Sequence, residues 1–229
     1  MNGLVLPAPP PATVPVHGTS ARFPVRRIFC VGRNYADHAR EMGHDPDREP
    51  PFFFAKPADA LLTDGADLPY PPATRDLHFE GELVVALGAG GADLSPQAAS
   101  DLIWGYAAGN DMTRRDLQAE AKRMGRPWDM AKGFDGAAIC GAIRPAASTG
   151  PLDRGKLSLS VDGEIRQRAC LSQMIWAVPD IIAHLSRLVR VAPGDLIYTG
   201  TPAGVGAVNC GQVMTVTIEG LDPVTTRVA

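Results

Sequence analysis

The stretch LHFEGELVVALG, residues 77–88, decides our interpretation of the fold. Its second half is an apolar run rich in β-branched residues that ends at a glycine, which predicts a β-strand. Side chains two positions apart share one face of a strand, so we expect Glu80 and Glu82 to project side by side. The residues expected to face a core on the opposite side are Leu83, Val85 and Leu87.

Two carboxylates held together beside an apolar strand repel each other and lose solvation, and a divalent cation would relieve both problems. For an E-x-E pair alone, a polar strand end in water is the alternative. A third carboxylate, Asp111, ends another expected strand at 103–111. Three converging carboxylates match a hard cation such as Mg²⁺, which keeps water in its remaining positions. Zn²⁺ fits less well, because the acids outnumber any His or Cys at suitable spacing.

Composition narrows the function classes. The chain has 229 residues, 45% of them hydrophobic, and a net charge of -3, which predicts one domain with a sizeable core. The negative charge and the lack of a basic stripe argue against nucleic acid and anionic membrane as partners. No stretch is long and apolar enough to span a membrane, and no signal peptide is evident. Four scattered cysteines without a C-x-x-C pair predict reduced thiols and a cytoplasmic protein.

The order of elements predicts many strands with a few helices between them, an α+β chain. Residues 1–22 are rich in proline and are interpreted as a short N-terminal extension, and residues 23–229 as a single domain. Asp162-Gly163 between alternating runs predicts a hairpin. The expected helices lie at 36–43, 95–102, 114–123 and 172–188.

The first of these helices carries a candidate general base. His38 and Glu41 are three positions apart and therefore share one helix face. A histidine can take a proton from water while a carboxylate orients its ring. An exposed helix with incidental charges is the alternative. The charged, proline-bounded loop at 44–51 is expected to form a lid beside this pair.

Several other residues are candidates for binding negative charge. Arg115 and Gln118 share a helix face, and together with Lys132 they can stabilise an oxyanion. The Gly200-Thr201 turn lets backbone N–H groups approach a carboxylate. Considered singly, each of these side chains is more typical of a solvated surface residue, and the glycine-containing segment is more typical of an ordinary turn. Gly150-x-x-x-x-Gly155-Lys156 resembles a phosphate loop, but Leu157 stands where Ser or Thr is required.

Five ordered motifs across roughly residues 25–220 resemble the fumarylacetoacetate hydrolase family, and within it the acylpyruvase branch that includes bacterial fumarylpyruvate hydrolases. The motifs are VGRNY at 31–35, H-x-E-x-E at 78–82, NDMTRRDLQ at 110–118, AKGF at 131–134 and TGTPAGVG at 199–206. The resemblance implies a mixed β-sandwich or β-roll core with a few short peripheral helices, a catalytic domain at 23–229, and usually a homodimer.

The resemblance also implies roles for individual residues. Glu80, Glu82 and Asp111 match Mg²⁺ or Mn²⁺ ligands, and His38 with Glu41 matches a water-activating dyad. The positions that match charge-stabilising residues are Arg115, Gln118 and Lys132. The positions assigned to the substrate are Arg33, Asn34, Tyr35, Gly200 and Thr201.

The implied activity is metal-dependent hydrolysis of the C3–C4 bond of a 2,4-dioxo acid, with fumarylpyruvate of gentisate breakdown as the expected substrate and fumarate and pyruvate as products. Alternatives of the same fold are a broader acylpyruvase with oxaloacetate decarboxylase activity, or a 2-oxo acid isomerase or decarboxylase. A non-catalytic metal scaffold is disfavoured because it needs no dyad. A fumaryl group also needs a cation for its distal carboxylate, and the candidates are Arg33, Arg40, Arg48, Lys56 and Arg126.

Overall fold

The computed structural model describes residues 3–41, 50–63 and 65–229. Its centre is an eight-stranded sheet in the order β4-β3-β14-β7-β8-β10-β5, with β11 also pairing with β8. Two pairs run parallel, β14 with β3 and β10 with β5, so the sheet is mixed. The strands are β3 (Arg27–Gly32), β4 (Phe52–Lys56), β5 (Leu61–Thr63), β7 (Gly81–Leu87), β8 (Ile103–Asp111), β10 (Ala138–Cys140), β11 (Arg144–Pro145) and β14 (Asp195–Tyr198).

The predicted strand of the opening stretch is β7, in the middle of this sheet. Every residue of β7 is buried, so both of its faces are covered. Leu83, Val85 and Leu87 belong to one apolar cluster, as predicted, while Val84 and Ala86 belong to a second cluster on the opposite face. A strand buried on both faces reads as a continuous apolar run, which accounts for the sequence LVVAL.

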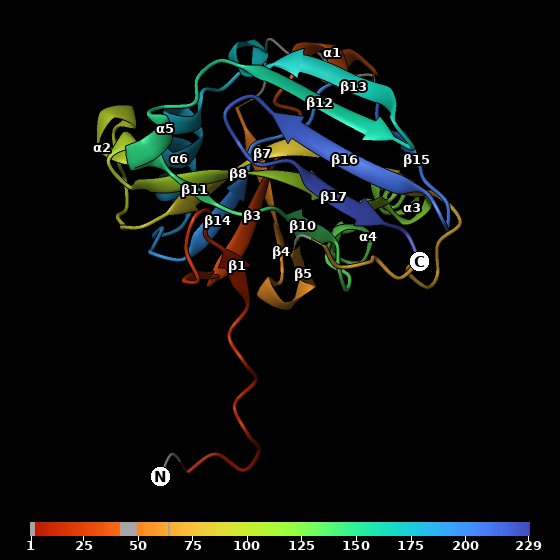
Figure 1. Cartoon of the computed structure of the whole chain (residues 1–229), viewed down its shortest axis with the longest axis horizontal. Coiled ribbons are helices and arrows are strands. Elements are labelled where there is room, and N and C mark those ends of the chain that lie inside the picture. Colours follow the sequence, from red (N-terminus) through yellow and green to blue (C-terminus); the bar gives the residue numbers. More distant parts are fainter. Residues whose placement is uncertain (1–2, 42–49, 64) are drawn as a thin grey trace.

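A four-stranded antiparallel sheet covers one face of the large sheet, as the cyan and blue arrows of Figure 1 show. The core between the two sheets includes Leu83 and Val85 from β7 and Leu159 and Val216 from the smaller sheet. Its strands, in spatial order, are β13 (Glu164–Cys170), β12 (Lys156–Val161), β16 (Val213–Ile218) and β17 (Val224–Arg227). The predicted hairpin is therefore confirmed, and the α+β, mixed β-sandwich class predicted from the sequence is correct.

The opposite face of the large sheet packs against the N-terminal segment. Strands β1 (Thr13–Pro15) and β2 (Arg22–Pro24) form a hairpin. Val14 and Phe23 from that hairpin join Ile28 and Val84 in the second apolar cluster. Ahead of the hairpin, the chain runs away from the body (Figure 1), and Val5 is 99% exposed. The division into an extension at 1–22 and a domain at 23–229 stays a prediction.

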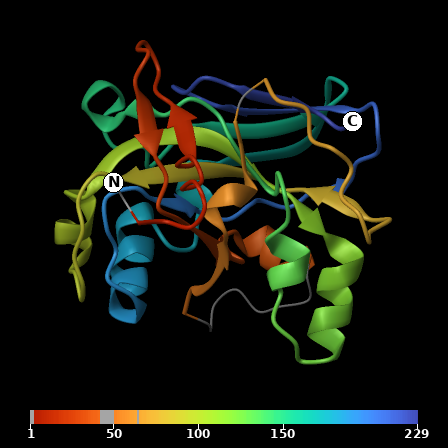
Figure 2. The ribbon, with the colours of Figure 1, turned by 90° about the horizontal axis from the view of Figure 1, so that it is seen from below.

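Short helices lie at the two ends of the sheets. Figure 2 shows α2 and α6 at one end and α3 and α4 at the other. The helices are α1 (Ala36–Glu41), α2 (Pro96–Ser100), α3 (Arg115–Arg123), α4 (Asp129–Lys132), α5 (Ala146–Thr149) and α6 (Val178–Leu188), with 3₁₀ turns at Ala58–Ala60 and Leu171–Gln173. None of the helices in the described ranges has the length and apolar character that crossing a membrane requires.

The helix predicted at 172–188 is wrong in its first part. α6 begins only at Val178, with Pro179 in its first turn, where the missing N–H of proline costs no hydrogen bond. The residues before it form the turn Leu171–Gln173 instead. α3 spans Arg115–Arg123, in good agreement with the prediction of 114–123.

A small three-stranded sheet brings distant parts of the chain together beside β7. Its order is β15 (Gly206–Ala207), β6 (Leu77–Phe79) and β9 (Thr113–Arg114). The two partners of β6 follow the Gly200-Thr201 turn and the end of β8, respectively. The start of β7, the end of β8, the start of α3 and the 200–206 loop therefore meet at one place.

Candidate metal centre and active site

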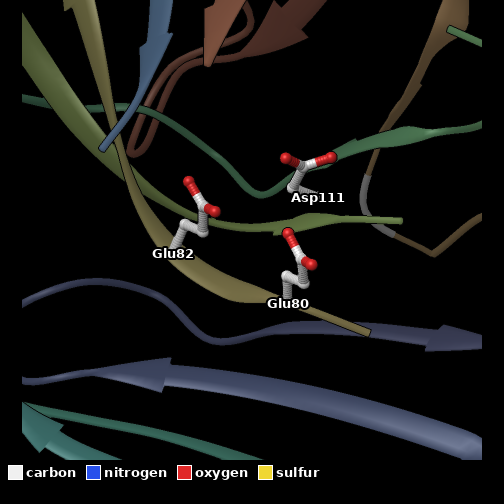
Figure 3. A group of neighbouring side chains, drawn as sticks. All are labelled: Glu80, Glu82 and Asp111. Carbon is white, nitrogen blue, oxygen red and sulfur yellow. The ribbon is translucent and has the colours of Figure 1, made fainter. Parts of the chain in front are cut away.

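Glu80, Glu82 and Asp111 converge where β7 begins and β8 ends. Glu80 joins β6 to β7, and the Asp111 N–H donates to the Glu80 carbonyl oxygen over 2.8 Å. One carboxylate oxygen from each residue lies within 4.8 Å of the other two, and all three residues are buried. Figure 3 shows the three side chains projecting to the same side of the neighbouring strands. The expected triad is therefore assembled by strand pairing.

Three cations form ion pairs with these carboxylates: Lys132, Arg115 and Lys56. The Lys132 ammonium donates to Glu80 Oε2 over 2.7 Å and to Asp111 Oδ2 over 2.9 Å. Burial alone would raise the pKa of the Glu80 carboxyl, but Lys132 and Arg115 outweigh it and hold this pKa well below the usual range. Burial likewise opposes the charged form of Lys132, yet Asp111 and Glu80 raise the pKa of its ammonium. Ion pairing inside the chain therefore keeps Glu80 ionised.

The residues present fit a hard divalent cation. Burial, together with the neighbouring charges of Asp111 and Glu80, raises the pKa of the Glu82 carboxyl well above its ordinary value. Asp111 Oδ1 is buried and lies 2.7 Å from Lys56 Nζ, but it accepts no aligned hydrogen bond from any described residue. A crowded carboxylate and an under-used oxygen both gain from a cation, and an all-oxygen donor set suits Mg²⁺ or Mn²⁺.

The candidate base pair, His38 and Glu41, lies on α1. His38 Nδ1 lies 3.2 Å from Glu41 Oε2, and His38 is only 6% exposed. The Gly204 N–H donates to Glu41 Oε2 over 3.3 Å, which links the dyad to the 200–206 loop. His38, Glu80 and Glu82 line one cleft. The loop expected to act as a lid spans 44–51, and its residues 44–49 lie outside the described residues.

Arg115 connects the charge-stabilising residues to the triad. Its guanidinium donates to Glu80 Oε1 over 2.5 Å and to Gln118 Oε1 over 2.6 Å, one helical turn further along α3. A third donor of Arg115 reaches His78 Nδ1 over 3.3 Å, while His78 Nε2 contacts Asp76. Both residues line the cleft, and because the Gln118 oxygen accepts from Arg115, the amide N–H₂ of Gln118 is the group left to donate to a ligand.

The Gly200-Thr201 turn does approach a carboxylate, but the carboxylate belongs to the protein. The Gly200 N–H donates to Glu82 Oε2 over 2.8 Å. The turn requires glycine at position 200, because its φ is +97° and a Cβ would lie 2.7 Å from the Cβ of Asn34. Thr201 lines the cleft, and its hydroxyl donates to the Gly81 carbonyl oxygen over 2.9 Å.

The three residues assigned to substrate from the VGRNY motif have different surroundings. Arg33 lines the cleft and has a left-handed backbone at φ 60°, an uncommon conformation for a residue with a side chain. Asn34 is buried and bonded at both ends of its amide, to Trp176 and to the Thr199 carbonyl oxygen. The Tyr35 hydroxyl is buried and has no hydrogen-bond partner in the part of the chain that the structure describes, and burial raises the pKa of this phenol.

Two buried residues of the site have no evident sequence signal. Gln167, on β13, accepts from the Gly81 N–H over 2.9 Å and donates to Thr201 Oγ1 over 2.8 Å. Lys56, a candidate for the distal carboxylate, is 2% exposed; it pairs with Asp111 and donates to the backbone carbonyl oxygens of Met112 and Lys132. Lys56 therefore supports the triad and is not available to the end of a substrate. Neither role could be read from residue type or spacing.

Comparisons with known proteins agree with this geometry. The family model described as fumarylacetoacetate (FAA) hydrolase C-terminal matches residues 27–229. A fumarylpyruvate hydrolase of a Ralstonia species is 44% identical over 182 residues, covering 79% of this chain and 94% of that protein. An oxaloacetate decarboxylase of Dictyostelium discoideum is 41% identical, covering 86% of this chain and 90% of that protein.

A solved structure extends the comparison to three dimensions. The crystal structure of fumarylpyruvate hydrolase from Pseudomonas aeruginosa, in complex with Mn²⁺ and pyruvate, is 49% identical and has a TM-score of 0.96. The match covers 99% of each chain. A family model over most of the chain, relatives above 40% identity and a near-complete structural match all agree with the five motifs: this chain belongs to the fumarylacetoacetate hydrolase family.

Proposed function

We propose that this protein is a metal-dependent hydrolase that cleaves the C3–C4 bond of a 2,4-dioxo acid, with fumarylpyruvate as substrate and fumarate and pyruvate as products. The observation that carries the proposal is that Glu80 and Glu82 of the carboxylate triad line one cleft together with His38, whose Nδ1 lies 3.2 Å from Glu41 Oε2. The relative from Pseudomonas aeruginosa, named for this activity and solved with Mn²⁺ and pyruvate, supports it.

Glu80, Glu82 and Asp111 would hold Mg²⁺ or Mn²⁺. When bound, the cation supplies Lewis-acid stabilisation of negative charge on the 1-carboxylate and 2-oxo oxygens of the substrate. We assign the nearby positions Arg33, Asn34, Tyr35, Gly200 and Thr201 to the substrate side of the cleft. Within this set, Asn34 and Gly200 act indirectly, because Asn34 holds the Thr199 carbonyl oxygen and Gly200 holds Glu82.

His38 would activate water. Its Nδ1 faces Glu41, which leaves Nε2 as the nitrogen that takes a proton. As water loses that proton to Nε2, its oxygen forms a bond to C4 of the substrate, and the C4 carbonyl oxygen takes the negative charge. Glu41 stabilises the imidazolium that results.

Lys132, Gln118 and Arg115 would stabilise the oxyanion on C4. Two of the three N–H donors of Lys132 contact Glu80 and Asp111, so one donor remains for the reacting oxygen. A donor at a developing oxyanion is worth about 3 kcal/mol. When the C3–C4 bond breaks, its electron pair passes to C3 and pyruvate leaves as an enolate. The proton on His38 Nε2 returns to C3, which gives pyruvate and the free carboxylic acid.

Oxaloacetate decarboxylation is a second candidate, because a relative with 41% identity carries that name. It uses the same stabilisation of a pyruvate enolate but needs no activated water. The two activities therefore make different demands on His38.

The test measures turnover of fumarylpyruvate, acetylpyruvate and oxaloacetate by the wild type with Mg²⁺, with Mn²⁺ and with a chelator. We expect chelator-sensitive loss of fumarylpyruvate, with equal amounts of fumarate and pyruvate formed. His38→Gln should lower this rate by about 10²–10⁴-fold. His17→Gln is the matched control, because His17 pairs with Asp222 and does not line the cleft.

Each result has a clear meaning. Full turnover by His38→Gln would exclude the proposed dyad mechanism. If oxaloacetate were consumed fastest, with release of CO₂ and no loss in His38→Gln, the protein would be a decarboxylase. Cleavage that persists after metal removal would exclude the triad as a catalytic metal site.

Further features of the proposal concern assembly and context. We propose a homodimer, a role in gentisate breakdown and a preference for Mg²⁺ or Mn²⁺. The four cysteines are unpaired, which favours a reducing compartment such as the cytoplasm. Analytical ultracentrifugation would test the dimer, and metal titration would rank the two cations.

A further inference from the structure

An outer chamber adjoins the catalytic cleft. It has a volume of about 700 Å³, while the cleft itself holds about 40 Å³. Both spaces are lined by Arg33, Phe52, Phe54, Trp128 and Lys132, so the chamber opens directly from the cleft. Arg126 and Asp129 line the chamber only.

Because the cleft is much smaller than the chamber, a substrate that is too large for the cleft must extend into both spaces. About 40 Å³ accommodates roughly three water molecules, since each needs roughly 10–15 Å³ of this kind of volume. Only the pyruvoyl end of a 2,4-dioxo acid can lie beside Glu80 and Glu82. Its acyl chain must pass the aromatic walls made by Phe54 and Trp128, and the end of that chain reaches the chamber.

The described part of the chamber lining carries an excess of positive charge. Among the lining residues within 3–41, 50–63 and 65–229, Asp129 is the acidic one, against the guanidinium groups of Arg33 and Arg126 and the ammonium of Lys132. Lys122, at the cleft, lies 5.0 Å from the Trp128 ring centre. Partial burial, followed by the charges of Arg115 and Arg33, lowers the pKa of the Lys122 ammonium.

The cations of the chamber occupy different places. Lys132 is bound to Glu80 and Asp111, and Arg33 lines both spaces, with its guanidinium 5.1 Å from the Phe52 ring centre. Arg33 therefore lies where the cleft opens into the chamber. Arg126 lines the chamber alone, which places it further from the triad along the path of the acyl chain.

The backbone holds Arg126 in a fixed position. After α3, the Arg126 N–H donates to the Ala121 carbonyl oxygen over 2.8 Å, and the Gly125 N–H donates to the Lys122 carbonyl oxygen over 3.2 Å. With φ +63° at Gly125, these bonds form a Schellman motif, and Pro127 restricts the backbone of the residue before it, Arg126.

The Schellman motif itself does not require an arginine at position 126. An apolar contact with the helix is frequent at this position of the motif. Arg126 is instead exposed, and its guanidinium has no protein partner within 3–41, 50–63 and 65–229. Its guanidinium therefore lines the chamber and is available to a ligand there.

We propose that the chamber binds the distal carboxylate of a dicarboxylic acyl group and that Arg126 is the residue that selects it. The proposal rests on the proposed function for the identity of the reaction. The guanidinium of an arginine whose backbone is fixed beside the chamber can bind a carboxylate through two parallel hydrogen bonds, which a neutral acyl group cannot accept. Arg126 thus separates fumarylpyruvate from acylpyruvates that end in a methyl group.

The kinetic test compares Arg126→Gln and Arg126→Lys with the wild type on fumarylpyruvate and acetylpyruvate. For fumarylpyruvate, Arg126→Gln should raise KM so that kcat/KM falls roughly 10–100-fold, with kcat little changed. For acetylpyruvate, kcat/KM should stay within about twofold. Arg126→Lys should recover part of the loss, because it restores the charge without the paired donors.

Arg123→Gln is the matched control. It removes the same charge near the end of α3 from an exposed residue that lines neither space. Equal losses in Arg123→Gln and Arg126→Gln would indicate a long-range charge effect and overturn the assignment. Equal losses on both substrates, or no loss on fumarylpyruvate, would overturn it as well.

A binding measurement keeps this proposal separate from the proposed function. Fumarate and crotonate differ in one distal group, a carboxylate against a methyl, and calorimetry on the Mn²⁺-loaded enzyme compares their affinities without turnover. We expect fumarate to bind the wild type at least tenfold more tightly, and Arg126→Gln to remove that preference. If the wild type cleaved no acylpyruvate yet showed this pattern, the subsite would stand and the reaction would fall. Equal binding of the two ligands would overturn the subsite.

Discussion

Removing the amide of Gln167 should damage both the fold and the metal centre. Gln167 is 1% exposed and lies on β13, in the smaller sheet. Its Oε1 accepts from the Gly81 N–H, and Gly81 separates the two glutamates of the triad. Its Nε2 donates to Thr201 Oγ1 and to the Pro202 carbonyl oxygen, both over 2.8 Å. One side chain thus connects the start of β7 and the 200–206 loop to the smaller sheet by hydrogen bonds.

The magnitude follows from these three hydrogen bonds. A buried hydrogen bond contributes about 1 kcal/mol net, and an unpaired buried donor costs about 1–3 kcal/mol. Gln167→Ala should therefore lower the free energy of unfolding by about 3 kcal/mol. Partners that orient metal ligands typically change metal affinity about 10–100-fold, and we expect a loss in that range for Mn²⁺.

Urea denaturation measures the first effect and Mn²⁺ titration calorimetry the second. Gln173→Ala is the matched control, since exposed Gln173 accepts one hydrogen bond, from the Cys170 N–H over 2.7 Å. It should lower the free energy of unfolding by about 1 kcal/mol or less and leave Mn²⁺ affinity unchanged. If Gln167→Ala behaved like this control in both assays, the argument that Gln167 positions the triad would be refuted.

Two further predictions concern stability. Asp116→Ala should lose about 1–3 kcal/mol at pH 7, because its carboxylate accepts from Thr74 Oγ1 and the Arg75 N–H. Partial burial raises the pKa of Asp116, but these bonds outweigh it and hold this pKa below 3.8. The stabilisation is therefore complete above that value and is lost as pH falls through the lower folded-state pKa. Urea titrations at pH 7 and at pH values stepped down from 3.8 should show the stability difference between the two proteins shrinking; a constant difference would contradict this. Gly125→Ala should cost about 1–2 kcal/mol in thermal unfolding, because φ is +63° there, and an unchanged midpoint would refute the strain.

The triad could be predicted from the sequence because short-range rules place it. The two-residue period of a strand puts Glu80 and Glu82 on one side, and strand pairing brings Asp111 opposite Glu80. The role of Gln167 could not be predicted, since it depends on the β12–β13 hairpin folding over the start of β7, and Gln167 lies 86 residues from Gly81 along the chain. The sequence of β13, EIRQRAC, places Gln167 on the strand face opposite Glu164, Arg166 and Arg168, but it does not show which backbone groups its amide meets.

Lys56 is a second residue whose contacts could not be predicted from the sequence. Its sequence context, an apolar strand followed by proline, fits a lysine reaching out from a strand end. Only the tertiary structure brings the end of β8 and α4 around it, so that its ammonium meets Asp111 and two backbone carbonyl oxygens. Residue type therefore predicted a cation near the site, whereas contacts between distant segments decided what the cation binds.

The charges of the site explain why it would favour a dianionic substrate. Glu80, Glu82 and Asp111 are formally balanced by Lys56, Lys132 and Arg115, so the chain alone supplies a nearly neutral buried cluster. Unpaired burial of these acids would be far more costly. A divalent cation then adds two positive charges beside the cleft, and a substrate with two carboxylates restores the balance. One carboxylate lies near the triad and the other reaches the chamber, which extends the same electrostatic complementarity along the whole substrate.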